Sequence, residues 1–193
     1  ETPPGLRDYL VARRAEQFAF LSALVRINSE NPPGHSAGVT RKLEELLLGQ
    51  NFTIERRPVD ADAAMALGRE PYDMLSVSLE FGDDPAAGPM LVLACHADTA
   101  PAGQDWTHDP QGAAIDGGRM FGRGVSDGKG DLAAYVYALL AVRDCADGLQ
   151  GRVQLLIGFD GASGGELGPH RLLAGADQQP NFAIVPGAAR AIG

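Results

Sequence analysis

The amino-acid sequence predicts an α/β fold, a three-layer α/β/α sandwich with a mostly parallel sheet. The apolar run from Met90 to Cys95 shows no polar alternation, which is typical of a strand buried on both faces of a parallel sheet. Short runs of this kind alternate along the chain with stretches of helical spacing, and this order indicates helices packed on a sheet. The 193 residues, with 45% apolar and 21% charged side chains, suffice for one core. We therefore treat residues 1–193 as a single domain.

Two helices are expected before the first strand. Apolar residues recur at helical spacing from Leu6 to Ile27 and predict one amphipathic helix, which ends before the turn-forming sequence at residues 31–34. A second helix is expected from about Ser36 to Leu48, with Ser36 as its N-terminal cap and Gly49 at its end.

Five strands and two further helices complete the predicted order. Leu75 to Phe81 alternates cleanly between apolar and polar residues, so we expect one solvated face and a position towards a sheet edge. The run Met90–Cys95 is expected to be a central strand. The remaining strands are expected at Phe52–Pro58, Val153–Phe159 and Phe182–Val185, and the helices at Leu132–Val142 and Ser163–Ala174.

Two groups of polar residues mark a candidate site. His96 and Asp98 follow the central strand directly, and ligands in open α/β sheets lie off the carboxyl ends of strands. These two side chains are therefore candidates for metal binding or acid/base chemistry. The glycine-dense turn at residues 122–130 places Asp127 just ahead of the next helix. Such glycine density indicates a close approach of the backbone or positive φ angles.

This pairing closely resembles the di-zinc metallopeptidase family that groups aminoacylase, acetylornithine deacetylase, succinyl-diaminopimelate desuccinylase and glutamate carboxypeptidase. The order and spacing of the family motifs match at residues 95–101, at Trp106 with Asp109 and Pro110, and at residues 116–130, and residues 24–34 resemble the family's N-terminal pattern. The resemblance implies the N-terminal part of a zinc-peptidase-like catalytic domain, with the lid or dimerisation domain absent. It also implies an ancestral substrate with an amide bond next to a free carboxylate.

The sequence departs from the family where the resemblance implies further acids. After the strand at 153–159 the family carries a general base and then a metal ligand, whereas this chain has Gly161 and Ala162. The next strand should deliver another acidic ligand, and Gly187 stands there. The resemblance thus leaves His96 and the bridging Asp127 as metal ligands, with Asp98 orienting His96, and the fifth ligand would lie beyond Gly193.

Too few ligands remain for the family's chemistry. A catalytic zinc ion needs three protein ligands and a water molecule, and loss of a general base typically costs ~10²–10⁴-fold in rate. We therefore expect zinc to be absent or weakly bound. The substitute ligands to consider are His108, His170, Asp160 and Glu166. The two histidines fit surface positions better, Asp160 fits a residue that buttresses the turn, and Glu166 lies about one helical turn beyond Ala162.

A serine nucleophile is an alternative in the same turn. Residues 161–165 satisfy G-x-S-x-G between a predicted strand and a predicted helix, which places Ser163 at the nucleophile position. His170 and Asp177 follow, in the order Ser, His, Asp rather than the Ser, Asp, His of α/β hydrolases. The other interpretation is that Ser163 caps the helix.

Three hypotheses about function follow. In the first, the chain is a family member that does not hydrolyse by itself and has a binding, scaffolding or repurposed role. In the second, it is a zinc-dependent amidohydrolase or peptidase for N-acyl amino acids or peptides, completed by another segment or by rebuilt ligands. In the third, it is a serine hydrolase that uses Ser163. Any surviving pocket is expected around His96, Asp98, Asp127, Asp160 and Gly161, and it would suit a small amide or an amino acid.

Composition and charge argue against some classes of partner and indicate a cellular location. The net charge of −9 argues against nucleic acid and anionic membranes, which would need a basic face. The longest apolar runs, about seven residues, are far too short to span a membrane. Cys95 and Cys145 form no disulfide framework. Without a recognisable signal peptide we expect a cytoplasmic protein. The strand at 182–185 is expected to leave an open sheet edge, which favours a homo-oligomer or a partner chain that completes the sheet.

Overall fold

The structure of the protein is a computed structural model, which describes residues 5–32, 34–174 and 179–186. Its main sheet has the strand order β1-β2-β6-β3-β7. These strands are β1 (Ile54–Pro58), β2 (Asp73–Phe81), β3 (Met90–His96), β6 (Gly151–Gly158) and β7 (Phe182–Ile184). The β3 strand runs parallel to β6 and β7, and β2 runs antiparallel to both β1 and β6. Four strands therefore point the same way, as the sequence predicts.

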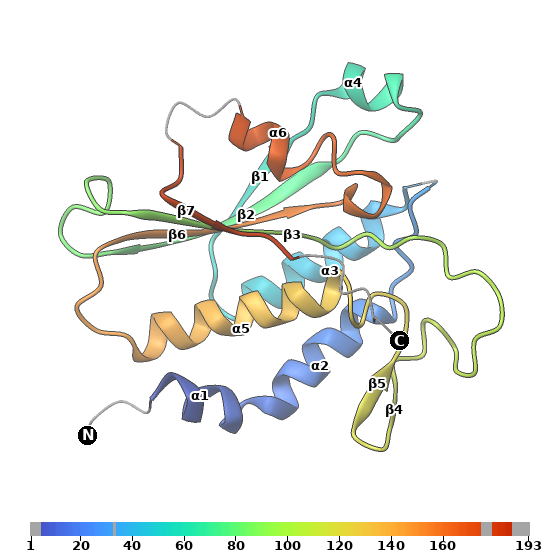
Figure 1. Ribbon diagram of the computed structural model, residues 1–193, viewed down its shortest axis with the longest axis horizontal. Coiled ribbons are helices and arrows are strands. Elements are labelled where there is room, and N and C mark those ends of the chain that lie inside the picture. The colour runs from blue at the N-terminus through green and yellow to red at the C-terminus, as the bar shows by residue number, and fades with distance from the viewer. Residues whose placement is uncertain (1–4, 33, 175–178, 187–193) are drawn as a thin grey trace.

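Helices cover both faces of the sheet (Figure 1). The helices α1 (Leu6–Ala12), α2 (Arg14–Val25), α3 (Ser36–Gly49) and α5 (Lys129–Cys145) lie on one face. The short helices α4 (Ala61–Ala66) and α6 (Pro169–Ala174) lie on the other. The predicted three-layer arrangement is confirmed. None of the helices in the described parts of the chain is long and apolar enough to cross a membrane.

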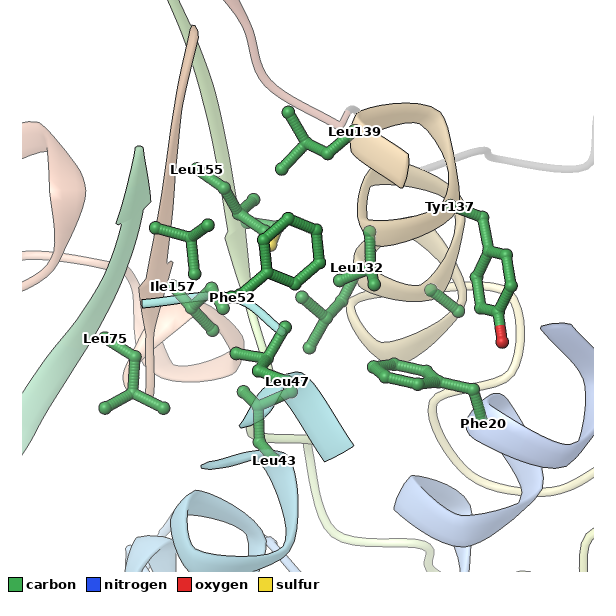
Figure 2. Close-up of a cluster of buried hydrophobic side chains, with 14 of the residues drawn as sticks. Phe20, Leu43, Leu47, Phe52, Leu75, Leu132, Tyr137, Leu139, Leu155 and Ile157 are labelled. Carbon is green, nitrogen blue, oxygen red and sulfur yellow. The ribbon is translucent and has the colours of Figure 1, made fainter. Parts of the chain in front are cut away.

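The main core lies between the sheet and the α5 face. Leu155 and Ile157 of β6 point towards Leu132 of α5, and Leu43 and Leu47 of α3 close the cluster from below (Figure 2). These side chains are buried, and their distribution follows the two-residue period of the strand and the helical spacing of the helices. This packing holds α5 against β6 and β3, and so fixes the start of α5 relative to the ends of the two strands.

The N-terminal helical region differs from the prediction. The single helix expected from Leu6 to Ile27 is divided at Arg13, whose backbone (φ −98°, ψ 15°) interrupts the helix, into α1 and α2. Both helices contact α5. The helix can therefore bend at its centre while each half keeps its own apolar contacts with α5.

The bounds of α3 confirm the prediction, but its caps differ. Ser36 is the first helical residue and gives no side-chain cap, and the helix ends at Gly49 as predicted. The left-handed position after the helix belongs to Asn51, which has a φ of 59°. The Asn51 N–H donates to Leu48 O at 2.9 Å, and the Phe52 N–H donates to Leu47 O at 3.1 Å. This pair of bonds is a Schellman motif with asparagine in the left-handed position.

The predicted order lacks one helix, α4, and one hairpin, formed by β4 and β5. The helix α4 is capped by Asp60, whose side chain accepts a hydrogen bond from Ala63 N. The strands β4 (Ala114–Asp116) and β5 (Arg119–Phe121) form a hairpin whose turn consists of Gly117 and Gly118, both with positive φ. A Gly-Gly pair between two short strands is a hairpin signal that the sequence did contain.

The position of β2 in the sheet also differs from the expectation. We expected this strand towards an edge, but β1 pairs with its outer side. Residues 74–77 are buried although Ser76 lies among them. The alternation of apolar and polar residues therefore corresponds to a solvated face only in the second half of β2. The prediction of an open edge at the last strand is confirmed, because β7 has only β3 as a neighbour among the described residues and its side chains are exposed.

Candidate functional site

The parallel pairing of β3 with β6 brings the candidate residues together. His96 is the last residue of β3 and lies opposite Gly158 in β6. The residues that follow the two strands, Asp98 and Gly161, therefore meet at the carboxyl edge of the sheet. Asp127 arrives from the turn before α5, with its Oδ1 at 3.6 Å from His96 Nε2. The predicted convergence of His96, Asp98, Asp127 and Gly161 is thus present.

Asp98 is the most heavily bonded residue of this site. It is 1% exposed, and it accepts hydrogen bonds from His96 Nδ1 at 3.0 Å, Asn31 Nδ2 at 3.2 Å, and the backbone N–H groups of Gly161 and Ala162 at 3.0 Å each. Four donors compensate the cost of burying the carboxylate. The same bonds fix the imidazole ring, because a carboxylate at Nδ1 keeps the proton on that nitrogen and leaves Nε2 facing Asp127.

The pKa of His96 is raised above its ordinary value by its acidic neighbours. Burial by itself lowers this pKa, but the hydrogen bond to Asp98 and the charges of Asp98 and Asp127 outweigh the burial. The ring therefore favours protonation more than a solvent-exposed histidine does, with one carboxylate on each side of it.

The backbone of two glycines lies close to the His96 ring. A Cβ atom at Gly161 would lie 2.3 Å from His96 Cγ, and a Cβ atom at Gly128 would lie 2.8 Å from His96 Cε1. Gly128 also has a φ of 76°. The glycine density of the turn therefore reflects a close approach of the backbone, as the sequence indicates. At Gly161 the space that any side chain would occupy is filled by the imidazole.

Asp160 supports the turn after β6. It is 1% exposed, and it accepts hydrogen bonds from the Tyr72 hydroxyl and from Leu167 N at 2.7 Å each. Arg69 lies 3.4 Å from Asp160 and also donates to the Ser163 carbonyl. Burial, and then the charge of Asp160, raises the pKa of Tyr72. The expected buttressing role of Asp160 is confirmed, and its oxygens already have partners within the protein.

Ser163 lies at the end of a short 3-10 helix, η1 (Gly161–Ser163), and α6 begins only at Pro169. The helix predicted from Ser163 to Ala174 is therefore present only from Pro169 to Ala174, and the helix-cap interpretation of Ser163 is wrong. The Ser163 hydroxyl donates to Asp160 O at 3.1 Å and accepts from Asn31 Nδ2 at 3.0 Å. The hydroxyl proton of Ser163 is thus donated to a main-chain carbonyl. The His170 side chain and Asp177 lie outside the described parts of the structure.

The other substitute ligands form no ion pair or hydrogen bond with His96 among the described residues. The His108 ring stacks on Phe121 with ring centroids 4.2 Å apart. Glu166 is exposed and lines a neighbouring apolar cavity. Gly187 lies outside the described residues. Among the residues that the structure describes, no group of three or more His, Cys, Asp or Glu side chains could hold a metal ion.

Zinc is the ion that the motifs imply, and the residues present do not fit it. In the described part of the chain, His96 Nε2 and Asp127 are the two donors at the site, whereas a catalytic zinc ion needs three protein ligands. The oxygens of Asp98 and Asp160 are turned to hydrogen-bond donors inside the protein. Within the described residues the arrangement thus provides an oriented, acid-flanked histidine rather than a coordination shell.

Asn31 and its neighbours form a support that sequence reasoning missed. The segment from Ser29 to Asn31 runs alongside residues 97–99, with Ser29 Oγ donating to Ala97 O at 2.8 Å and Asn31 N donating to Thr99 O at 2.8 Å. Asn31 is 3% exposed, and its amide nitrogen reaches Asp98, Phe159 O and Ser163. We assigned this asparagine only to a turn, because nothing local in the sequence shows its distant partners.

Lys129 fastens the same segment to α5. Its side chain is 1% exposed, and Nζ donates to Leu24 O at 3.0 Å and to Ile27 O at 2.8 Å. Burial lowers the pKa of Lys129 to about 8, although the charge of Asp98 acts in the opposite direction. The amine thus holds the carboxyl end of α2 where the chain turns towards Asn31.

Two cavities open beside His96. One, of about 490 Å³, is lined by polar groups that include Asp98, Arg123, Ser126 and Asp127, together with Trp106. The other, of about 570 Å³, is mainly apolar and is lined by Ala94, Cys95, Pro169, Leu173 and Val185 among others. His96 and Gly161 belong to both linings. The site can therefore accommodate a small molecule.

Comparisons with known proteins agree with the motifs. The model of peptidase family M20/M25/M40 matches residues 92–188. Succinyl-diaminopimelate desuccinylase of Rhodospirillum centenum is 34% identical over 156 residues, which are 80% of this chain and 36% of that protein. The same enzyme of Gluconobacter oxydans is 38% identical over 100 residues, which are 50% of this chain and 26% of that protein. The chain thus spans about a third of the length of these relatives.

Solved structures show the same fold. Human carnosine dipeptidase 1 superposes with a TM-score of 0.74 at 19% identity, over 95% of this chain and 41% of that one. An M20 family metallo-carboxypeptidase from Sulfolobus solfataricus superposes with a TM-score of 0.60 at 20% identity, over 75% of this chain and 31% of that one.

Proposed function

Because this chain belongs to peptidase family M20/M25/M40, we propose that it is a family domain that does not hydrolyse amides by the metal route and instead binds a small amide or amino-acid ligand. In this proposal His96 and Asp127 are the remaining metal-ligand positions, and Asp98 orients His96. Gly161 stands at the lost general-base position, and Ala162 and Gly187 at lost ligand positions.

The observation that carries the proposal is the closure of the turn at Gly161 and Ala162 around Asp98 and His96. The two backbone N–H groups bind Asp98, and the His96 ring fills the space of a side chain at position 161. An acid at position 161 would therefore need a different position of His96. This supports a site adapted to glycine rather than one that merely lacks a carboxylate.

The donor set supports the same proposal. Among the described residues, two family donors face each other at the site, and zinc bound by two protein ligands is held weakly. Without the general base, activity by the metal route should fall by a further ~10²–10⁴-fold. The cavity of about 490 Å³ beside His96 remains large enough for a ligand.

One observation favours a second candidate, a zinc-dependent amidohydrolase or peptidase. The chain spans about a third of the relatives that it matches, so residues from another segment could add the missing donors. The two candidates differ in what the chain does with zinc. The serine hydrolase hypothesis has weaker support, because the Ser163 hydroxyl donates to a main-chain carbonyl and none of the described residues offers it a base.

Zinc binding by the purified 193-residue chain tests the proposal. We expect well below one zinc ion per chain by mass spectrometry of metals, and only weak binding in a calorimetric zinc titration. His96→Ala should abolish the weak binding, whereas His108→Ala should leave it unchanged, because the His108 ring stacks on Phe121 and is not part of the cavity lining. Tight stoichiometric zinc that depends on His96, together with hydrolysis of N-acyl amino acids or dipeptides, would overturn the proposal in favour of the hydrolase.

A further inference from the structure

Arg123 is the one arginine that the described residues contribute to the lining of the polar cavity beside His96. No ion pair joins it to an acid among the described residues, although the chain has a net charge of −9. Other arginines, such as Arg69 and Arg56, are paired with carboxylates. A cation without an acidic partner in the wall of a cavity needs an explanation, because such a group can bind an anion from solution.

The backbone on both sides of Arg123 is tightly held. Its N–H donates to Pro110 O at 2.7 Å. A Cβ atom at Gly122 would lie 2.5 Å from Val25, and one at Gly124, which has a φ of 91°, would lie 2.9 Å from Thr99. The two glycines therefore let the loop pack closely against its surroundings. The backbone position of Arg123 is therefore fixed in the absence of a ligand.

The guanidinium is also oriented. Arg123 Nε donates to Ala100 O at 2.7 Å. This bond uses one N–H group at the inner side of the guanidinium, and the structure gives the terminal N–H groups no partner among the described residues. A planar fork with free terminal donors matches the two oxygens of a carboxylate. Fixing the fork in advance reduces the entropy that binding would cost.

The rest of the cavity fits a small organic acid. The Trp106 side chain is 38% exposed, and its Nε1 is held by Ala102 O at 2.8 Å. Trp106 thus offers an apolar surface in the same cavity as Arg123. Asp127, also in the lining, disfavours a ligand with several negative charges beside His96. These features together suit a ligand with one carboxylate and a compact uncharged remainder.

We propose that Arg123 binds the carboxylate of a small acid in the polar cavity between Trp106 and His96. This inference rests on the proposed ligand-binding function and deepens it, because it names the group that the ligand must carry. Arg123 thereby selects acids over the corresponding neutral amides, whereas the hydrogen bonds around Asp98 serve to hold the site in shape.

A matched pair of probes tests this proposal. N-Acetyl-L-methionine carries a free carboxylate, and N-acetyl-L-methionine amide has the same shape without the charge. Each is titrated into the 193-residue chain while NMR follows the Arg123 Nε–H resonance and the Trp106 Nε1–H resonance. We expect the wild type to bind the acid at least tenfold more tightly than the amide, with shifts at both resonances.

Variants separate Arg123 from general charge effects. Arg123→Met should weaken binding of the acid by about 10- to 100-fold and leave binding of the amide unchanged, and Arg123→Lys should retain part of the preference. Arg119→Met is the control, because Arg119 is an exposed residue of β5 outside the cavity lining, and it should bind as the wild type does. Thermal unfolding of each variant establishes that the fold is kept.

The outcomes distinguish this inference from the proposed function. Equal binding of acid and amide by the wild type, no binding of either probe, or an Arg123→Met variant that is folded and binds the acid normally would each overturn the role of Arg123. Product formation is measured in the same samples. Hydrolysis of the probes by the wild type would overturn the non-hydrolytic function, and a selective effect of Arg123→Met on KM for the acid would then still support the carboxylate contact.

Discussion

His96 owes its position to one carboxylate of the family motifs and to the backbone of two glycines. Asp98 binds its Nδ1, and the backbone of Gly128 and Gly161 lies against its ring. The sequence predicted the convergence of His96, Asp98 and Asp127, because residues after parallel strands meet at one edge of a sheet. It could not predict that position 161 must stay small, since that depends on where the ring of another strand comes to lie.

Gly161→Ala tests this steric requirement. The new Cβ would lie 2.3 Å from His96 Cγ, so the ring or the turn must move. We expect a loss of about 1–3 kcal/mol in the free energy of unfolding by urea, typical of overpacking, and altered NMR resonances of the His96 imidazole.

Gly49→Ala is the control for the loss of a glycine. Gly49 lies in α3, and a Cβ atom there would meet no heavy atom within 4 Å. Alanine is favoured over glycine in a helix, so this variant should be equally stable or more stable by up to about 1 kcal/mol. A Gly161→Ala variant as stable as the wild type, with unchanged His96 resonances, would show that position 161 is open to larger residues.

At the scale of elements, the sequence predicted the strands and helices that have long, regular patterns of apolar residues. It did not predict features that depend on contacts between elements distant in the sequence. The strands β3 and β6 and the helix α5 follow from apolar runs and helical spacing in their own residues. The break at Arg13 depends on the contacts of each half with α5, and the inner position of β2 depends on pairing with β1. Neither contact can be read from the residues of the element itself.

The attachment of α1 to α5 gives a pH-dependent contribution to stability. The Tyr9 hydroxyl donates to Asp144 Oδ2 at 2.5 Å. Burial, and then the hydrogen bond and charge of Asp144, raises the pKa of Tyr9 from 10.0 to about 12. Between these values the folded protein retains a proton that the unfolded chain has lost. The contribution of Tyr9 is therefore complete below pH 10 and is lost as the pH rises through about 12.

Tyr9→Phe isolates this contribution. The free energy of unfolding of the wild type should fall more steeply than that of Tyr9→Phe between pH 10 and 12, with a difference of about 1–2 kcal/mol across this window. Urea unfolding at several pH values measures it, and far-UV circular dichroism at pH 8 serves as the control for folding. Parallel curves for the two proteins would mean that the Tyr9 to Asp144 bond does not couple α1 stability to pH.

At the scale of the whole molecule, strand direction explains why one edge of the sheet carries the site. Four strands point the same way, and the turns after β3 and β6 and before α5 meet at their ends. The sequence predicted this convergence from the order of elements. It did not predict the support from residues 29–31, because the place of this segment depends on contacts between α2 and α5, which are far apart in the sequence.

The open edge at β7 yields a last prediction. Phe182, Ile184 and Val185 are 65%, 50% and 66% exposed, and β7 has β3 as its only neighbour among the described residues. Unpaired apolar edges favour association, so the 193-residue chain should self-associate with rising concentration in analytical ultracentrifugation.

Ile184→Lys should reduce this association, because a charge on an edge strand opposes pairing. Val11→Lys, at a residue 65% exposed on α1, should leave it unchanged. If both variants associate like the wild type, the contact lies elsewhere, and a monomeric wild type would show that the edge is protected without a partner.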